Sequence, residues 1–509
     1  MGPKKDQITN LQILQKQTDL IFEYFNEPDI RYSPILSPDK IHLYHAKSKV
    51  IQNPQSYFKQ ILSEVLFFIP RIMWELSMAI LKHFYYIKNY AVFKENSFQE
   101  IDAFFVSHYT HGRNPQDDFD TFFGSLPFRK ESGKNLILLI DHMARRKGIK
   151  NYEILRQSSK QYLLLPKTCS NKLFFRILFV QIKNIFYVIY NLFSVLSTIN
   201  IDIKFYLEIA RNQISRATIN NHVLLYNLSF ALEKANATQI TITYEGHAYE
   251  SYVIHKIKTR FKDIKIQIIQ HAPVVKSQNT FFRNLSFLPP DTKIFVTGKS
   301  IKKMILDSGF QVNSKIEILG SFKHTNKLST LKNKNKHLHV LIAIENDHKT
   351  SKDLTALAKK LSKAIPDIKF TIRLHPDFIL KRGNKDFSNL NNYPNLKLSS
   401  SSLARDLLAS DICIYNSSSI SIECLRYHVE PIHYSCYTNL DLDPIQLIDL
   451  PHKRFSDSQK AMKYLIYRSN NKSITSSYRL KMDEAYDRYY AIPNFINYFR
   501  NIKKEPTIF

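Results

Sequence analysis

Short apolar segments alternate with amphipathic segments along this chain of 509 residues, and this alternation restricts its fold more than any other feature. In the first half, strands are expected at Ala103–Ser107, Asn135–Asp141, Gln239–Tyr244, Ile264–Gln270, Thr292–Thr297 and Lys315–Leu319. Helices are expected at Asp117–Glu131, His247–Phe261 and Lys299–Ser308. Strands that alternate with helices favour a parallel sheet with crossover helices, so we predict an α/β fold.

A second series of the same kind follows a polar, Lys/Asn-rich segment. Strands are expected at Leu338–Ile344, Ile368–Leu374, Asp411–Tyr415 and Pro431–Tyr434, and helices at Lys352–Ala364, Ser402–Ala409 and Ile420–Tyr427. We therefore predict a helical extension (1–95), a first Rossmann-like domain (96–320), a linker (321–337), a second Rossmann-like domain (338–450) and a helical tail (451–509). The tail is expected to pack back across the linker.

Two hydrophobic stretches precede or interrupt the first domain. Tyr57–Tyr90 is rich in Phe, Ile, Leu and Tyr, and Pro70 is expected to end or kink a helix there. The second stretch is an insertion at 172–203 that carries no charge from Asn184 to Ile201. This nearly reaches the length of a membrane span, but several Asn, Ser and Thr residues dilute it. A buried core helix and a helix lying on an anionic membrane surface both remain open, because Lys172, Arg176 and Lys183 stand beside aromatic residues.

The composition limits the classes of partner and cofactor. The net charge of +28 indicates either an anionic partner or Lys-Ile-Asn drift in an AT-rich genome. Nucleic acid is not expected, because no binding motif appears and the positive charge is spread along the chain. With only ten glycines there is no glycine-built phosphate loop, and the four cysteines lack zinc-site spacing. The N-terminus has no apolar signal core, so we expect a cytoplasmic protein, extended to the inner face of the plasma membrane if the insertion binds lipid.

Three polar clusters follow expected strands. They are Tyr244-Glu245-Gly246-His247, Arg373-Leu374-His375-Pro376 and Asn416-Ser417-Ser418-Ser419, the last with Glu423 four residues beyond. Open α/β sheets bind ligands outside the carboxyl ends of their strands. The clusters combine a carboxylate, a histidine and a hydroxyl-rich helix start, which suits transfer of a group from a nucleotide-activated donor.

Each cluster has a chemical interpretation and an ordinary one. Glu245 can take a proton from an acceptor hydroxyl, or it can compensate a helix N-terminus. His375 can stabilise a leaving phosphate, and Arg373 shares its strand face. Ser417–Ser419 can bind phosphate or only cap a helix, and Glu423 can accept hydrogen bonds from a ribose or be a solvated helix carboxylate. Around the acceptor we expect His247, His271 and His108, with His111 and Arg113 as further members of a polar loop.

Two Asp-x-Asp patterns look like metal sites. Asp441-Leu442-Asp443 lies in an expected loop, and Asp118-Phe119-Asp120 lies on an expected helix. Neither pattern stands at the end of a strand in the second Rossmann-like domain, where a nucleotide is expected to bind. We therefore expect no metal ligand in either pattern.

The order of the three clusters resembles that of bacterial sialyltransferases and related Kdo transferases, which are GT-B glycosyltransferases. These enzymes share an acidic-Gly motif, a His-Pro motif and a Ser-Ser/Thr motif, matched here by Glu245-Gly246, His375-Pro376 and Ser417-Ser418-Ser419. Tyr244 stands where they carry a second acid. Phe123–Pro127 and Tyr244–Glu250 also resemble bacterial surface-carbohydrate biosynthesis proteins. The resemblance covers about residues 100–450.

The resemblance implies a metal-independent glycosyltransferase without a cofactor that uses a CMP-activated acidic sugar, a nonulosonic acid or Kdo. It implies that Glu245 is the base, that His375 stabilises the leaving phosphate, and that Ser417–Ser419 hold the CMP phosphate while Glu423 holds the ribose. The acceptor would be a surface glycan or a lipid-linked glycan. Two alternatives stay open: the same fold with a CDP-polyol or a UDP- or GDP-sugar donor, and a non-catalytic membrane-associated scaffold in polysaccharide assembly.

Overall fold

The computed structural model describes the strands, the helices and most of the segments that connect them. The described residues are 18–32, 34, 36, 54–89, 101–109, 119–129, 133–141, 162–192, 194–195, 203–275, 278–322, 337–345, 348–375, 390, 392–436, 442–471 and 474–499. The expected linker and the loop with His111 and Arg113 lie largely or wholly outside this part of the chain, as do Pro376, Asp118 and Asp441.

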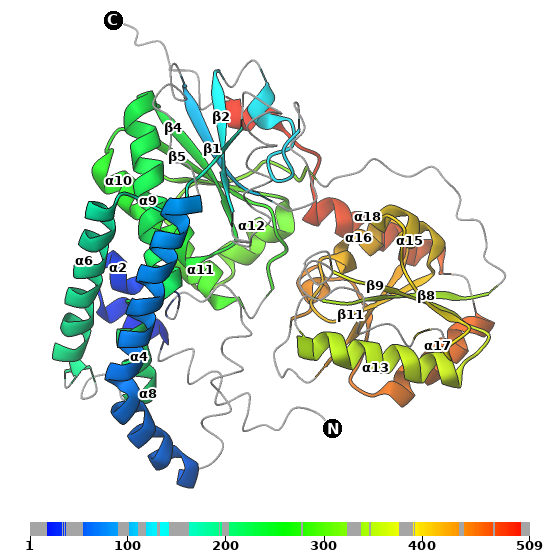
Figure 1. The fold of residues 1–509 in the computed structure, drawn as a ribbon. Coiled ribbons are helices and arrows are strands. Elements are labelled where there is room, and N and C mark those ends of the chain that lie inside the picture. The colour runs from blue at the N-terminus through cyan, green and yellow to red at the C-terminus, as the bar shows by residue number, and fades with distance from the viewer. Residues whose placement is uncertain are drawn as a thin grey trace, which may run out of the picture.

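The first unit is built on a seven-stranded sheet whose order is β3-β2-β1-β4-β5-β6-β7 (Figure 1). Its strands are β1 (Ala103–His108), β2 (Asn135–Ile140), β3 (Tyr162–Leu164), β4 (Gln239–Tyr244), β5 (Lys265–Gln270), β6 (Lys293–Val296) and β7 (Ile316–Ile318). Neighbouring strands pair in parallel. The chain winds outward from β1 to β3, then returns to place β4 beside β1.

The second unit repeats this winding in a six-stranded parallel sheet, with the order β10-β9-β8-β11-β12-β13. Its strands are β8 (His339–Ala343), β9 (Lys369–Arg373), β10 (Leu396–Leu398), β11 (Ile412–Tyr415), β12 (Glu430–Tyr434) and β13 (Lys453–Phe455). Both orders are those of a Rossmann sheet. The predicted fold class, α/β with two Rossmann-like units, is confirmed by this topology.

Helices cover the sheets and extend beyond the first one. In the first unit they are α2 (Pro28–Arg31), α4 (Pro54–Asn89), η3 (Leu126–Phe128), α6 (Asn171–Tyr190), α8 (Ile203–Asn212), α9 (Arg216–Ala235), α10 (Ala248–Arg260), α11 (Asn279–Ser286) and α12 (Lys299–Leu306). In the second unit they are α13 (His348–Ala364), α15 (Leu403–Ala409), α16 (Ile420–Arg426), η6 (Pro444–Leu447) and α17 (Ser458–Asn470), followed by α18 (Ser476–Tyr489) and α19 (Phe495–Phe499).

The C-terminal tail returns to the first unit. Helix α18 packs against α16 and α12, one from each unit. Beyond it, the Asn494 N–H donates to the Leu319 carbonyl at 2.7 Å, and the buried ring of Tyr498 joins the apolar cluster on one face of the first sheet. The tail therefore ties the two units together.

Three expectations about helices differ from the structure. The described part of Asp117–Glu131 is not one continuous helix, because the Asp120 carboxylate accepts the Phe122 and Phe123 N–H groups in a turn, and only the short 3-10 helix η3 follows. Of the two alternatives predicted for Pro70, an end of the helix is excluded, because α4 continues to Asn89. The insertion is not one helix to residue 203, since α6 ends at Tyr190 and α8 begins at Ile203.

Candidate active site

Polar side chains gather where the winding of each sheet reverses. In the first sheet this point lies between β1 and β4, and in the second between β8 and β11. Loops on either side of such a point diverge and leave room for a ligand at the carboxyl ends of the strands. His108 ends β1 and Glu245 follows β4, while Glu345 and Ser417 each stand two residues beyond the end of their strands, β8 and β11.

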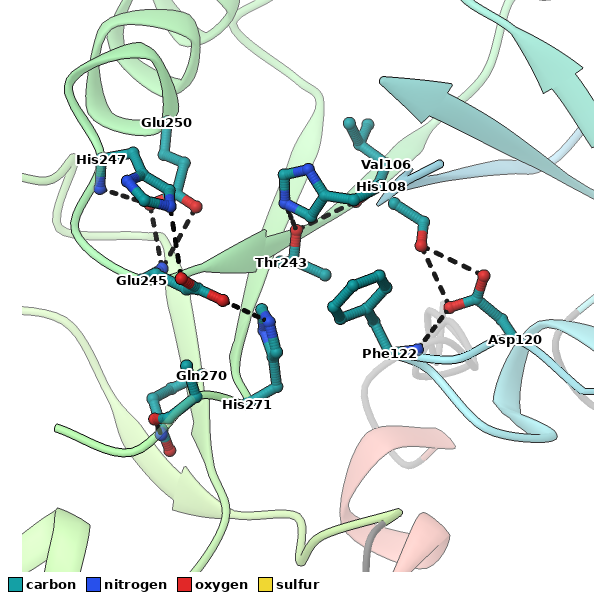
Figure 2. A network of polar contacts seen from close by, with 12 residues as sticks. Val106, His108, Asp120, Phe122, Thr243, Glu245, His247, Glu250, Gln270 and His271 are labelled. Carbon is teal, nitrogen blue, oxygen red and sulfur yellow. Dashed lines mark hydrogen bonds and ion pairs between the residues drawn. The ribbon is translucent and has the colours of Figure 1, made fainter. Parts of the chain in front are cut away.

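Glu245 lies between two histidines at this edge of the first sheet (Figure 2). One carboxylate oxygen is 2.6 Å from His271 Nε2, and the other is 3.3 Å from His247 Nε2. His271 comes directly after β5, the neighbour of β4, and His247 precedes α10. The Glu245 side chain is 30% exposed, compared with 9% for His271, so the carboxylate is the accessible member of the group.

Two carboxyl groups of this cluster differ in protonation. Burial alone would raise the pKa of Glu245, but attraction to His271 and hydrogen bonds from both histidines outweigh it and hold that pKa well below its usual value. Glu250, in the first turn of α10, is fully buried, and burial raises its pKa to about 8. Near neutral pH, Glu245 is therefore an anion beside a neutral carboxylic acid. Such divergence between neighbouring acids is typical of acid–base sites.

Glu250 fixes the backbone around Glu245. It accepts hydrogen bonds from the Glu245 and His247 N–H groups at 2.8–3.1 Å and from the Tyr249 hydroxyl at 3.3 Å. The Tyr249 hydroxyl also lies 3.2 Å from His108 Nε2, which is 3.1 Å from Thr243 Oγ1. The structure thus brings Glu245, His247, His271 and His108 into one cluster.

The backbone conformation at residue 246 requires a glycine directly after Glu245. Its φ of +85° lies in the left-handed region that favours glycine. A Cβ at this position would also stand 2.7 Å from the Cα of Phe281 in α11. The tight turn and the close packing of α11 together direct Glu245 toward His271.

At the equivalent edge of the second sheet, the serine cluster has a partner that the sequence did not reveal. The backbone N–H and the hydroxyl of Ser417 both donate to the carboxylate of Glu345, a buried residue just after β8. Ser418 Oγ accepts from the Ile420 N–H at 3.4 Å, and the side chain of Ser419 caps no helix N–H. A carboxylate therefore occupies the Ser417 donors that were expected to hold phosphate.

The remaining predicted donor-side residues are not gathered around Ser417 in the same way. Arg373 pairs with Asp406 of α15 at 2.6 Å and donates to the Ser401 carbonyl, a structural role within this unit. His375 follows β9 and is half-buried, and Glu423 is half-buried on α16. Burial raises the pKa of Tyr490 in the returning tail, and the negative charge of Glu423 raises it further. Glu423 therefore lies near that tail.

The described residues of the two Asp-x-Asp patterns have structural partners. Asp120 accepts the Ser107 hydroxyl at 3.1 Å in addition to the turn N–H groups. Asp443 accepts the Tyr415 hydroxyl at 2.8 Å and lies 2.5 Å from His452 Nε2. Among the residues that the structure describes, no group of His, Cys, Asp or Glu is arranged to hold a metal ion.

A cavity of about 170 Å³ adjoins the first cluster. It lies between the carboxyl ends of β2 and β3 and helix α9, and Tyr249 forms part of its wall. Lys167, paired with Asp141 at 2.8 Å, and Arg216 of α9 supply positive charge. The cavity therefore offers both acidic and basic side chains to a ligand beside Tyr249.

Comparison with known proteins gives similarity of overall arrangement only. No protein-family model matches the chain, and no curated protein matches it. A glycotransferase of kitacinnamycin aligns at 10% identity and a TM-score of 0.46, over 79% of this chain and 98% of that one. SnogD, a glycosyltransferase from Streptomyces nogalater, aligns at 10% and 0.46 over 79% and 99%. A putative UDP-N-acetylglucosamine 2-epimerase from Listeria monocytogenes aligns at 9% and 0.45, over 77% and 92%. We assign no activity from these alignments.

Proposed function

We propose that this protein is a glycosyltransferase that moves a sugar from a nucleotide-activated donor to a hydroxyl group of a glycan or lipid-linked acceptor. The observation that carries the proposal is the Glu245 carboxylate, ionised and accessible between His271 and His247 at the reversal point of the first sheet. At the reversal point of the second sheet, the N–H and hydroxyl of Ser417, which now donate to Glu345, are proposed to bind the nucleotide once that carboxylate is displaced.

In the proposed reaction, the acceptor hydroxyl attacks the anomeric carbon and its proton passes to Glu245. The bond between the anomeric carbon and the donor phosphate breaks, and its electron pair remains on the phosphate. His375 hydrogen-bonds that phosphate and stabilises its charge. The cavity beside Tyr249 binds the acceptor, with Arg216 near its polar groups.

The donor is proposed to be a CMP-activated nonulosonic acid or Kdo, transferred without a cofactor or catalytic metal. The order of Glu245-Gly246, His375-Pro376 and Ser417–Ser419 supports this choice. Glu423 is proposed to hold the ribose, and Ser417, Ser418 and Ser419 the phosphate. Because Glu345 occupies the donors of Ser417, nucleotide binding must displace or reorient that carboxylate.

Binding of nucleotides tests the donor class. A ligand that binds only the folded state raises the unfolding temperature, so the thermal shift with CMP should exceed the shifts with CDP, UDP and GDP. A larger shift with CDP, UDP or GDP would transfer the proposal to a CDP-polyol or a UDP- or GDP-sugar donor. The absence of any shift, together with no turnover of any donor, would favour the non-catalytic scaffold.

Nucleotide release in the presence of donor and acceptor tests the site. Glu245→Gln keeps the shape of the side chain but removes the base, and should lower turnover by about 10²–10⁴-fold. His375→Ala should also lower turnover, whereas Glu233→Gln and His337→Ala provide controls on exposed residues. Wild-type turnover in both Glu245→Gln and His375→Ala would sink the site assignment.

A further inference from the structure

Helices α4 and α6 present a large apolar surface to solvent. Of the twenty-two exposed large hydrophobic side chains in the described part of the chain, fourteen belong to these two helices. They are Leu66, Phe67, Ile69, Met73, Trp74, Leu81, Phe84, Tyr85, Ile87, Phe175, Phe179, Phe186, Tyr187 and Tyr190, called here the α4–α6 face. Apolar patches of this extent on soluble proteins mark an interaction surface.

Both helices are fixed to the first unit by their opposite sides. Phe68, Ile72, Leu76 and Ile80 of α4 pack against the apolar core, and the helix contacts α8 and α9. Helix α6 contacts the same two helices. The ring of His83 in α4 stacks on Phe174 of α6 at 3.7 Å, which joins the two helices directly. Figure 1 shows both on the same side of the first unit.

The exposed side of α6 also carries all of its charge, and that charge is positive. Lys172, Arg176 and Lys183 recur at helical spacing among Phe175, Phe179, Phe186 and Tyr190, and α6 contains no acidic residue. The three cations form no ion pair with any residue that the structure describes. Aromatic side chains interleaved with free cations are the pattern of a helix lying in the headgroup region of an anionic bilayer.

We propose that the α4–α6 face docks the protein on an anionic lipid bilayer, with the aromatic rings inserted and the three cations at the headgroups. This inference does not depend on the proposed transfer reaction. Asn171–Tyr190 is also long and apolar enough to cross a membrane. However, Phe174, Ile177, Leu178, Ile185 and Val188 on its inner side are buried against the protein core, so α6 lies along the bilayer rather than through it.

The chain contains one tryptophan, and it lies on this face. Trp74 is 66% exposed on α4, so its emission reports directly on insertion. Full-length protein is mixed with vesicles of phosphatidylcholine alone, or of phosphatidylcholine with phosphatidylglycerol. We expect co-sedimentation and a blue shift of Trp74 emission only with the anionic vesicles, and release of the protein at high salt because surface charges are then screened.

Three variants separate the contributions. Phe179→Ser with Phe186→Ser should weaken vesicle affinity at least about tenfold, because two buried aromatic side chains are lost. Lys172→Gln with Arg176→Gln and Lys183→Gln should weaken it about tenfold to a hundredfold for anionic vesicles. Leu306→Ser with Leu480→Ser, on the exposed sides of α12 and α18, is the matched control and should bind as wild type.

Five outcomes would overturn the proposal. One is no binding to anionic vesicles, and another is binding that neither the Phe nor the cation variant weakens. Binding that leaves Trp74 emission unchanged would exclude α4 from the surface as proposed. Retention after a high-salt wash would show a spanning helix instead. A wild-type dimer that the Phe variant makes monomeric, without vesicle binding in either, would assign the face to a second copy of the chain.

Discussion

Glu245, just before α10, and Glu250, in its first turn, lie five residues apart, and their surroundings shift their pKa values in opposite directions. Glu245 faces two histidines, whereas Glu250 is buried and has only neutral donors in hydrogen-bond contact. Only Glu250 has a raised pKa, of about 8 against the usual 4.5. The folded chain therefore binds a proton there that the unfolded chain releases.

Because of this proton, the folded state becomes less stable as the pH rises. Between pH 4.5 and 8, the folded state holds more protons at Glu250 than the unfolded state, so the free energy of unfolding decreases as pH rises, by up to about 1 kcal/mol per pH unit. Urea unfolding of wild type and Glu250→Gln at several pH values measures this. The free energy of wild type relative to the variant should decline across that window, and a constant difference would contradict the raised pKa.

Glu345 gives a second prediction at the scale of single residues. Its carboxylate faces the Ser417 donors, so a nucleotide phosphate at Ser417 meets a like charge. Glu345→Gln should bind CMP about tenfold more tightly, because like-charge contacts oppose binding. Titration of both proteins with CMP measures the dissociation constants. Weaker binding by the variant would mean that Glu345 accepts hydrogen bonds from the nucleotide itself.

At the scale of elements, the turn between β4 and α10 determines where Glu245 points. Gly246 has both a positive φ and a close neighbour, whereas Gly309 has a similar φ of +81° and nothing within 4 Å of its would-be Cβ. Gly309→Ala should therefore cost about 1 kcal/mol of strain, and Gly246→Ala roughly 1–3 kcal/mol more because α11 must shift. Chemical unfolding of both variants measures the difference. Equal costs would show that the contact with Phe281 is easily relieved.

The long strands and the first cluster were predictable because their signals are local. Strands such as Gln239–Tyr244 are short segments rich in β-branched residues, and polar residues directly after them must lie at the carboxyl edge of a parallel sheet. The three-residue edge strands β3, β10 and β13 give no comparable run. The continuous helix expected over Asp117–Glu131 does not form, because the Asp120 side chain accepts hydrogen bonds from backbone N–H groups beside it. The spacing of apolar residues does not reveal such a hydrogen bond.

The donor side was less predictable because its partners are remote in the chain. Glu345 meets Ser417 only because β8 and β11 are neighbours, 72 residues apart in sequence. Arg373 pairs with Asp406, 33 residues away, rather than facing a ligand. A carboxylate directly after the strand Leu338–Ile344 was the available signal for Glu345. Its pairing required the strand order, which a single sequence does not contain.

At the scale of the whole molecule, the C-terminal tail follows the second unit in sequence but packs against the first unit. Tyr498 is fully buried, and its hydroxyl lies 2.9 Å from Thr241 Oγ1 and accepts from Gln239 Nε2 at 3.0 Å, both on β4. Without the tyrosine, these two buried side chains would keep only longer hydrogen bonds, such as those of 3.3–3.4 Å to Gln267. The strand that leads to Glu245 thus depends on a residue near the C-terminus.

Tyr498→Ala should therefore destabilise the first unit by about 3–5 kcal/mol, since it removes a buried aromatic ring and the shortest side-chain hydrogen bonds of Gln239 and Thr241. Hydrogen exchange resolves the effect by element. Amides of β4 and β5 should lose protection, whereas those of β11 and β12, in the other sheet, should change little. Tyr467→Ala, at an exposed site on α17, is the control and should leave both sheets protected. Equal loss of protection in the two sheets would mean that the units unfold together, and unchanged protection in β4 would mean that the tail does not stabilise the strand carrying the proposed base.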